Sequence, residues 1–245
     1  MLKTMSRDFT PAKYAELLDA LAGYGEITLR HDVDLRPRRS LEIAKLEATK
    51  GWKAVYYFRA VPESFDEAVI REIASLGHEI GYHYENLAAC GGDFEAAWED
   101  FKKNLKRLRA IAPVSKICMH GSPLSKFDSR ELWRCYDYRS EGCNFEPYLD
   151  TDWSSCFYLT DTGRRWDGFR VSLRDRIPQW QDRWIADGLV YHSTDDIIAA
   201  ASKGLLPRRI MITTHPQRWV GALLPWLSEL MMQNAKNAVK RLINR

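Results

Sequence analysis

Several features are missing from this 245-residue sequence, and each absence argues against a class of protein. The five cysteines are odd in number and form no CxxC pair, which argues against a disulfide framework and a four-cysteine zinc site. No stretch approaches the ~20 apolar residues of a membrane span, and the N-terminus has no apolar run typical of a signal peptide. A net charge of +3 is too small to indicate nucleic-acid binding. We therefore expect a cytoplasmic protein.

Linkers, low-complexity tracts and repeats are absent as well, so we expect residues 1–245 to form a single domain. Short apolar runs alternate with amphipathic helical patterns along the chain, which predicts an α/β fold with a parallel sheet. These strand-helix units are numerous enough to form a closed, irregular parallel (β/α) barrel of about seven strands. The expected strands lie at 27–29, 54–58, 79–82, 115–119 and 209–213, with further short strands near Phe157 and Phe169.

Groups able to bind metal or carry protons follow four of these predicted strands, and four of the six histidines lie there. The carboxyl ends of parallel strands meet at one end of a barrel, so these groups should share one cleft. They are His31-Asp32-Val33-Asp34, Tyr82-His83-Tyr84-Glu85, Met119-His120-Gly121 and Thr214-His215-Pro216.

Asp32 and Asp34 are two positions apart, so in an extended segment their side chains point the same way. Two such carboxylates need a cation between them or a shared proton. Carboxylates with imidazoles suit Zn²⁺ or a similar divalent ion, which lowers the pKa of its water toward ~7. Taken singly, each residue has a structural alternative: Asp32 as a helix cap, His83 as a buried core histidine, and His120 as part of a turn.

The segment Gly77–His83 reads GHEIGYH and resembles GHEIGNH, the second motif of the polysaccharide deacetylase family (NodB-like, carbohydrate esterase family 4). Residues 29–34 and 214–216 stand where that family has its first and last motifs. The resemblance covers roughly residues 25–220 and implies a distorted parallel (β/α) barrel with metal-dependent N-deacetylation. It implies His83 as a metal ligand and His215 as the catalytic acid. We assign Asp32 as the base and Asp34 as a ligand, with the reverse left open.

The sequence also departs from the family pattern. Leu87 stands where the family has a second ligand histidine, so a bound metal needs a replacement ligand, either His120 or Glu85. We favour His120, because it ends a predicted strand and precedes a glycine. With HDVD as first motif and His215-Pro216-Gln217-Arg218-Trp219 at the end, the chain resembles a divergent branch of deacetylase-like proteins of bacterial surface-polysaccharide (O-antigen) loci.

The sequence therefore predicts Zn²⁺-dependent removal of the acetyl group from an N-acetylated sugar that is linked to a nucleotide or a lipid. We expect Arg59, Glu85, Arg218 and Trp219 to bind this substrate. The alternatives are an inactive sugar- or protein-binding module, suggested by Leu87, and a hydrolase of a non-sugar amide. The amphipathic segment 226–245 suits packing on the barrel with a solvated basic face better than contact with an anionic membrane surface.

Overall fold

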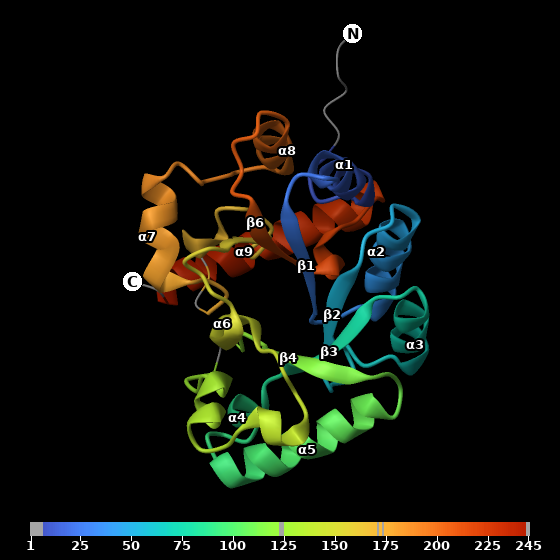
Figure 1. The fold of residues 1–245 in the computed structure, drawn as a ribbon, viewed down its shortest axis with the longest axis vertical. Helices are drawn as coiled ribbons and strands as arrows, with labels where there is room; N and C mark the ends of the chain where they lie inside the picture. The colour runs from blue at the N-terminus through green and yellow to red at the C-terminus, as the bar shows by residue number, and fades with distance from the viewer. Residues whose placement is uncertain (1–6, 123–124, 171, 173, 244–245) are drawn as a thin grey trace.

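The computed structural model describes residues 7–122, 125–170, 172 and 174–243. Its strands form one fully parallel, curved sheet in the order β4-β3-β2-β1-β6-β5 (Figure 1). This confirms the predicted α/β fold and agrees with a distorted (β/α) barrel. The strands are β1 Glu26–Val33, β2 Ala54–Phe58, β3 Glu79–Tyr84, β4 Val114–Met119, β5 Phe157–Thr160 and β6 Arg209–Thr214.

Helices cover the outer face of this sheet (Figure 1). Several begin where the sequence places a cap, as at Thr10 and Asp93, whose side chains accept backbone N–H bonds from the first turn. The α-helices are α1 Pro11–Leu21, α2 Pro37–Thr49, α3 Glu67–Ser75, α4 Asn86–Ala89, α5 Phe94–Arg109, α6 Pro147–Asp150, α7 Pro178–Ala186, α8 Thr194–Ser202 and α9 Leu223–Ile243. Short 3₁₀ helices span Ser129–Arg134, Tyr138–Glu141, Gly168–Arg170 and Pro216–Arg218.

The described residues form six strands, whereas the sequence indicates about seven. The difference lies at Phe169, where a short strand was predicted but a 3₁₀ helix forms. Gly168 explains the tight turn: a Cβ at this position would lie 2.3 Å from the carbonyl oxygen of Thr162. This close approach of two backbone segments is open only to glycine.

Along each strand, successive side chains point to opposite faces of the sheet. One set of side chains, such as Leu29 and Tyr56, packs under the outer helices in the main core. The opposite set points into the barrel, where Val55, Tyr57 and Cys118 form a small cluster. Gly81 makes room for it, since a Cβ there would lie 2.3 Å from the Tyr57 ring. Because this apolar cluster is small, polar residues of β1 and β3 occupy much of the rest of the inner face.

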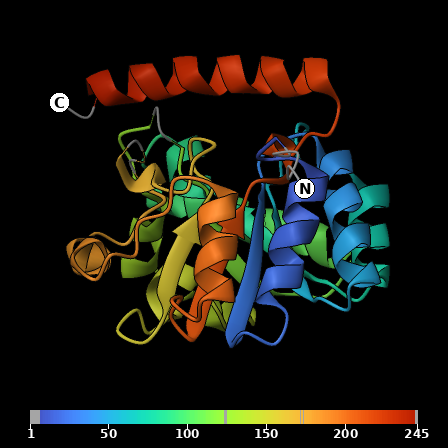
Figure 2. The same cartoon turned by 90° about the horizontal axis from the view of Figure 1, so that it is seen from above.

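Helix α9 lies across the end of the barrel where the strands finish and forms the outermost layer there (Figure 2). Over residues 223–239, the part of the helix whose side chains are described, the buried residues are polar, namely Glu229, Gln233 and Asn237, while Leu224 and Met231 are exposed. This reverses the expected packing, in which the apolar stripe of this segment would face the barrel. Residues 244–245 of that segment lie outside the described residues. Among the described residues, no helix is long and apolar enough to cross a membrane.

Candidate active site

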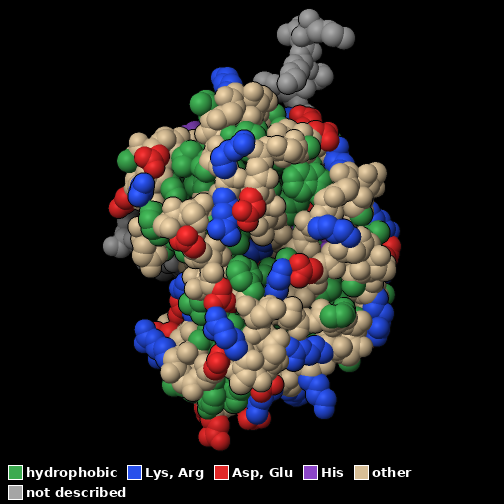
Figure 3. Space-filling model, viewed as in Figure 1, with side chains coloured by type: hydrophobic (Ala, Val, Ile, Leu, Met, Phe, Trp, Pro, Cys, Tyr) green, Lys and Arg blue, Asp and Glu red, His purple; other side chains and the backbone are tan. Residues whose placement is uncertain are grey.

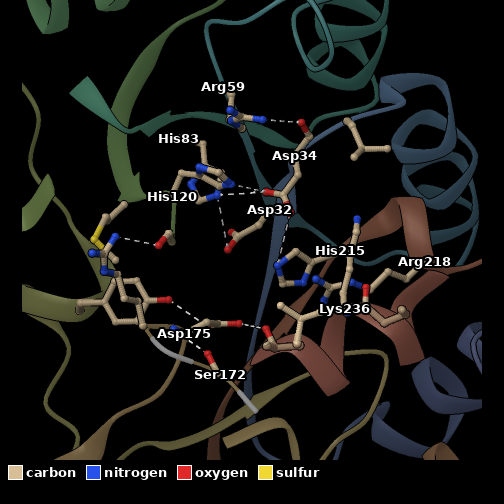
Figure 4. Close-up of a pocket in the computed structure, with 18 of the residues that line it drawn as sticks. Asp32, Asp34, Arg59, His83, His120, Ser172, Asp175, His215, Arg218 and Lys236 are labelled. Carbon is tan, nitrogen blue, oxygen red and sulfur yellow. Dashed lines mark hydrogen bonds and ion pairs between the residues drawn. The ribbon is translucent and has the colours of Figure 1, made fainter. Parts of the chain in front are cut away.

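The predicted strand-end residues converge on one cavity of about 540 Å³ (Figure 4). Asp32 lies in β1 and His83 in β3, both with inward-facing side chains, while His120 and His215 directly follow β4 and β6. Gln233 and Lys236 of α9 line the same cavity. The structure thus brings together all five residues for which the sequence predicts a catalytic or metal-binding role, Asp34 included.

Three of these side chains form a group that could hold a metal ion: Asp34, His83 and His120. The Asp34 Oδ1 atom lies 3.5 Å from His83 Nε2 and 3.7 Å from His120 Nε2. This Oδ1 atom is buried and has no hydrogen-bond partner among the described residues. A buried carboxylate oxygen without a partner is costly, and a divalent cation would satisfy it. The donor set, one carboxylate and two imidazoles, is that of a zinc site with open positions.

The second ring nitrogen of each histidine, Nδ1, contacts an oxygen atom of the protein on the side away from Asp34. His83 Nδ1 lies 2.9 Å from the Cys118 carbonyl oxygen, and His120 Nδ1 lies 2.8 Å from Glu85 Oε2. Such contacts fix which nitrogen of a ligand histidine is free to bind a metal. Arg59 in turn donates two bonds to Glu85 Oε1.

These contacts bear on which residue replaces the ligand missing at Leu87, which is fully buried in the core. Glu85 is engaged by His120 and Arg59, and His120 turns its free Nε2 atom toward Asp34. The geometry therefore favours His120 as ligand, with Glu85 as the residue that orients it. Arg59 and Glu85, expected to bind substrate, form an ion pair in which Arg59 lines the cavity and Glu85 does not.

The charge on Asp34 is stabilised by its neighbours. Burial alone would raise the pKa of this carboxyl, but the imidazoles of His215, His83 and His120 outweigh burial and hold the pKa well below its usual range. Burial is likewise outweighed at Glu85, where His120 and Arg59 lower the pKa to about 2. Both carboxylates are therefore ionised at neutral pH.

Asp32 has a different environment, because it forms a buried, two-pronged ion pair with Arg30. The Arg30 Nε and Nη2 atoms donate to the two carboxylate oxygens at 2.8 and 2.6 Å. The guanidinium also lies 4.8 Å from the centre of the Tyr148 ring. With one oxygen facing His83 Nε2 at 3.8 Å, Asp32 is anchored beside the candidate metal group. This supports Asp34 as ligand and leaves Asp32 for proton transfer.

A second possible metal group consists of Asp32, His83 and Cys118. It fits a metal less well, because Arg30 already neutralises Asp32. Burial also raises the pKa of the Cys118 thiol well above its ordinary value, whereas metal binding needs the thiolate.

His215 lies on the other side of Asp34, with its Nε2 atom 3.8 Å from Asp34 Oδ2. Its Nδ1 atom is 2.6 Å from Asp161 Oδ1. Burial and the nearby Arg218 guanidinium disfavour the charged imidazole, but the carboxylates of Asp161 and Asp34 outweigh them and raise the pKa of His215. His215 is therefore oriented and electrostatically prepared to donate a proton from Nε2.

Of the two C-terminal residues expected to bind substrate, Arg218 lies at the cavity and Trp219 does not. Both donate to Asp161, through Arg218 Nη1 at 2.8 Å and Trp219 Nε1 at 2.8 Å. Trp219 is 1% exposed and does not line the cavity, so its ring supports Asp161 instead of contacting a substrate. Arg218 reaches the cavity wall while holding the same carboxylate.

The sequence reasoning missed three charged residues: Arg30, Asp161 and Asp175. Arg30 precedes Asp32 by two positions, so the alternation that paired Asp32 with Asp34 also predicts that Arg30 faces the same side. Asp161 directly follows β5, a strand end like the others. Asp175 lines the cavity and accepts hydrogen bonds from the hydroxyl groups of Tyr148, Tyr158, Thr160 and Thr162. Its position in an irregular loop leaves no signal in the sequence.

Comparison with known proteins finds matches among solved structures. No protein-family model and no curated protein matches this sequence. Solved structures with a similar fold include a Streptococcus mutans CE4 esterase (TM-score 0.46, 11% identity, 93% of this chain and 85% of that one) and the Bacillus subtilis peptidoglycan deacetylase PdaC (TM-score 0.42, 13% identity, 89% and 96%). A third is a CE4 pseudoenzyme from Bacillus anthracis (TM-score 0.44, 11% identity), of which this chain, over 88% of its length, spans 61%. With TM-scores below 0.5 and identities below 25%, this likeness assigns neither family nor activity to this chain.

Proposed function

We propose that this chain is a metal-dependent hydrolase of amide bonds that removes the acetyl group from an N-acetylated sugar. One observation carries the proposal: Asp34 presents a buried, unpartnered Oδ1 atom to two oriented imidazoles within the cavity. Two groups suited to proton transfer, Asp32 and His215, flank this site. The sugar itself is proposed from the GHEIGYH segment at Gly77–His83.

Asp34, His83 and His120 would hold the ion, for which we propose Zn²⁺ on the basis of the donor set. A bound divalent ion supplies a Lewis acid for the acetamide carbonyl and favours deprotonation of water. Asp32, held by Arg30, accepts a proton from the water that attacks the carbonyl carbon. His215, held by Asp161, donates a proton to the sugar nitrogen as the carbon–nitrogen bond breaks. The products are acetate and a free amino sugar.

The cavity volume is within the range that encloses small ligands, of which one or two sugar units are an example. As a finer proposal, the substrate is a nucleotide- or lipid-linked sugar used in surface-polysaccharide (O-antigen) synthesis. The free state of all five cysteines supports a reducing, cytoplasmic location.

The test is release of acetate from soluble N-acetylated sugars, including a nucleotide-linked one, by the Zn²⁺-loaded protein. We expect Asp32→Asn and His215→Ala to lower kcat by at least about 100-fold, the usual contribution of a positioned acid or base. His192→Ala is the control, because this side chain is 66% exposed and lies outside the cavity.

Unchanged acetate release in both site variants would refute the scheme. Sugar binding without acetate release would indicate an inactive binding protein. Activity on non-sugar amides alone would support the proposed amide hydrolysis but show that the substrate is not an N-acetylated sugar.

A further inference from the structure

Two basic side chains at the cavity lack the acidic partner that its other basic groups have. Among the described residues, two of the four basic side chains lining the cavity are paired with carboxylates, Arg59 with Glu85 and Arg218 with Asp161. The other two, Arg174 and Lys236, are unpaired cations, since neither forms an ion pair within the described ranges. By contrast, acidic and basic side chains are interspersed on the face of the molecule drawn in Figure 3. Two uncompensated positive charges at one cavity indicate an anionic ligand.

The carboxylates that line the cavity do not neutralise the unpaired cations, because each has other neighbours. Asp32 accepts both bonds from Arg30, and Asp34 faces the imidazoles of the candidate metal group. Asp175 accepts hydrogen bonds from four hydroxyl groups. The positive charges are therefore left for a ligand.

Arg174 is held in place without being neutralised. Its Nη1 atom donates to the carbonyl oxygens of Gly121 and Ser122, each at 3.0 Å, and its Nη2 atom donates to that of Ser125 at 2.7 Å. A guanidinium has more N–H groups than these bonds use, so the Nε group and one N–H of Nη2 have no partner in the described part of the chain. These two groups share one edge of the planar guanidinium, an edge that can bind two phosphate oxygens in parallel.

We propose that Arg174 and Lys236 recognise a phosphate group on the substrate. A neutral N-acetylated sugar offers no charge to these cations. A phosphate monoester, or the diphosphate that links a sugar to a carrier, has about two negative charges at neutral pH, which matches both cations. Arg174 supplies a fixed planar fork, and Lys236, exposed on α9 at the cavity (Figure 4), supplies a flexible point charge. That the phosphate is attached to an N-acetylated sugar rests on the proposed function.

The test is calorimetric titration of the chelator-treated full chain with N-acetylglucosamine 1-phosphate, N-acetylglucosamine and inorganic pyrophosphate. We expect the phosphorylated sugar to bind at least about tenfold more tightly than the neutral one, because a hydrogen bond to a charged group contributes more than a neutral one. Pyrophosphate should bind as well, which makes the test independent of the sugar. Chelation removes any ion that could bind phosphate directly.

We expect Arg174→Gln to weaken binding of the phosphorylated sugar and of pyrophosphate at least about tenfold. Lys236→Gln should weaken both about twofold to fivefold, because Lys236 is exposed. Arg174→Lys distinguishes charge from loop structure. Lysine keeps the charge but cannot make all three carbonyl bonds, so it should recover part of the lost affinity.

Arg208→Gln and Lys203→Gln are the matched controls and should leave binding unchanged. Arg208 also donates to a carbonyl oxygen, that of Tyr24 at 2.9 Å, but it precedes β6, at the other end of the barrel. Lys203 is exposed at the end of α8, away from the cavity. Equal affinity for the phosphorylated and neutral sugars without pyrophosphate binding would overturn the proposal. So would site variants that bind as tightly as the two controls.

Two larger ligands distinguish the source of the phosphate: a uridine diphosphate-linked N-acetylglucosamine and the same sugar linked through diphosphate to a short-chain polyprenol. A preference for either one that Arg174→Gln removes supports the proposal and identifies the carrier. Acetate release from unphosphorylated N-acetylglucosamine by the Zn²⁺-loaded protein is measured separately. Phosphate binding without acetate release would contradict only the proposed function, and acetate release without phosphate binding would contradict only this inference.

Discussion

Asp32 and Asp34 are two positions apart, yet their surroundings give them different chemistry. Arg30 provides a permanent positive charge at hydrogen-bonding distance from Asp32, so Asp32 has a charged partner within the protein. Asp34 is surrounded by imidazoles, which can bind a metal or release a proton. The structure thereby favours one order of the two roles that the sequence left open.

The same reasoning identifies Asp161 as a positioning residue for His215. We expect Asp161→Asn to lower kcat by about 10²–10⁴-fold, because the imidazole loses the carboxylate that orients it and stabilises its protonated form. KM for a soluble N-acetylated sugar should change little, since Asp161 is fully buried behind His215 and does not line the cavity. Steady-state measurement of acetate release separates the two constants.

Asp167→Asn is the control for this prediction. Asp167 is also buried and paired with an arginine, Arg165, but does not line the cavity. If both variants lose activity equally, the effect of Asp161 is structural and the positioning role fails.

At the scale of elements, the carboxylate of Glu47 connects two helices and two strands near the candidate site. Glu47 of α2 accepts hydrogen bonds from Tyr14 of α1 and Tyr56 of β2, each at 2.6 Å, and contacts His31 of β1 at 2.7 Å. His31 in turn contacts Thr214, the residue before His215. Burial alone would raise the pKa of Glu47, but His31 and the two tyrosine hydroxyls outweigh it and lower the pKa.

We expect Glu47→Gln to reduce the free energy of unfolding by about 2–3 kcal/mol at pH 7, because an amide cannot accept all three bonds. A lowered folded-state pKa means that ionised Glu47 stabilises the fold above its unfolded-state pKa of about 4.3. This contribution is lost as the pH falls through the lower folded-state pKa. Urea unfolding should therefore show a large difference between wild type and variant at pH 7 that shrinks in acid. Glu42→Gln, on the exposed face of α2, should show little difference at pH 7.

Sequence patterns predicted most of the elements, and with them the convergence of the site. His83, His120 and His215 could be placed together because strand ends of a parallel barrel meet, whatever the details of packing. Asp175 could not be placed at the site from the sequence, because its loop follows no periodic pattern. Helix α9 shows a different limit: periodicity reveals that a helix has an apolar side but not which way that side faces. Here the polar barrel end beneath Glu229 and Asn237 determines the orientation.

At the scale of the whole molecule, the candidate metal group joins strands that are far apart in the sequence. Asp34 follows β1, His83 belongs to β3, and His120 follows β4. A ligand that binds only the folded state stabilises it by about 2.7 kcal/mol when present at 100 times its dissociation constant. An ion held by these three side chains therefore couples metal binding to the stability of the sheet.

We accordingly expect Zn²⁺ at 100 times its dissociation constant to raise Tm by about 5–10 °C relative to chelator-treated protein, since 1 kcal/mol corresponds to about 2–4 °C for a chain of this size. Asp34→Asn should abolish the shift, because it removes the only carboxylate of the group. His192→Ala should retain it, since His192 lies away from the cavity. Thermal unfolding followed by circular dichroism measures all three proteins without relying on activity. A shift that persists in Asp34→Asn would place the ion elsewhere and remove the main support for the proposed chemistry.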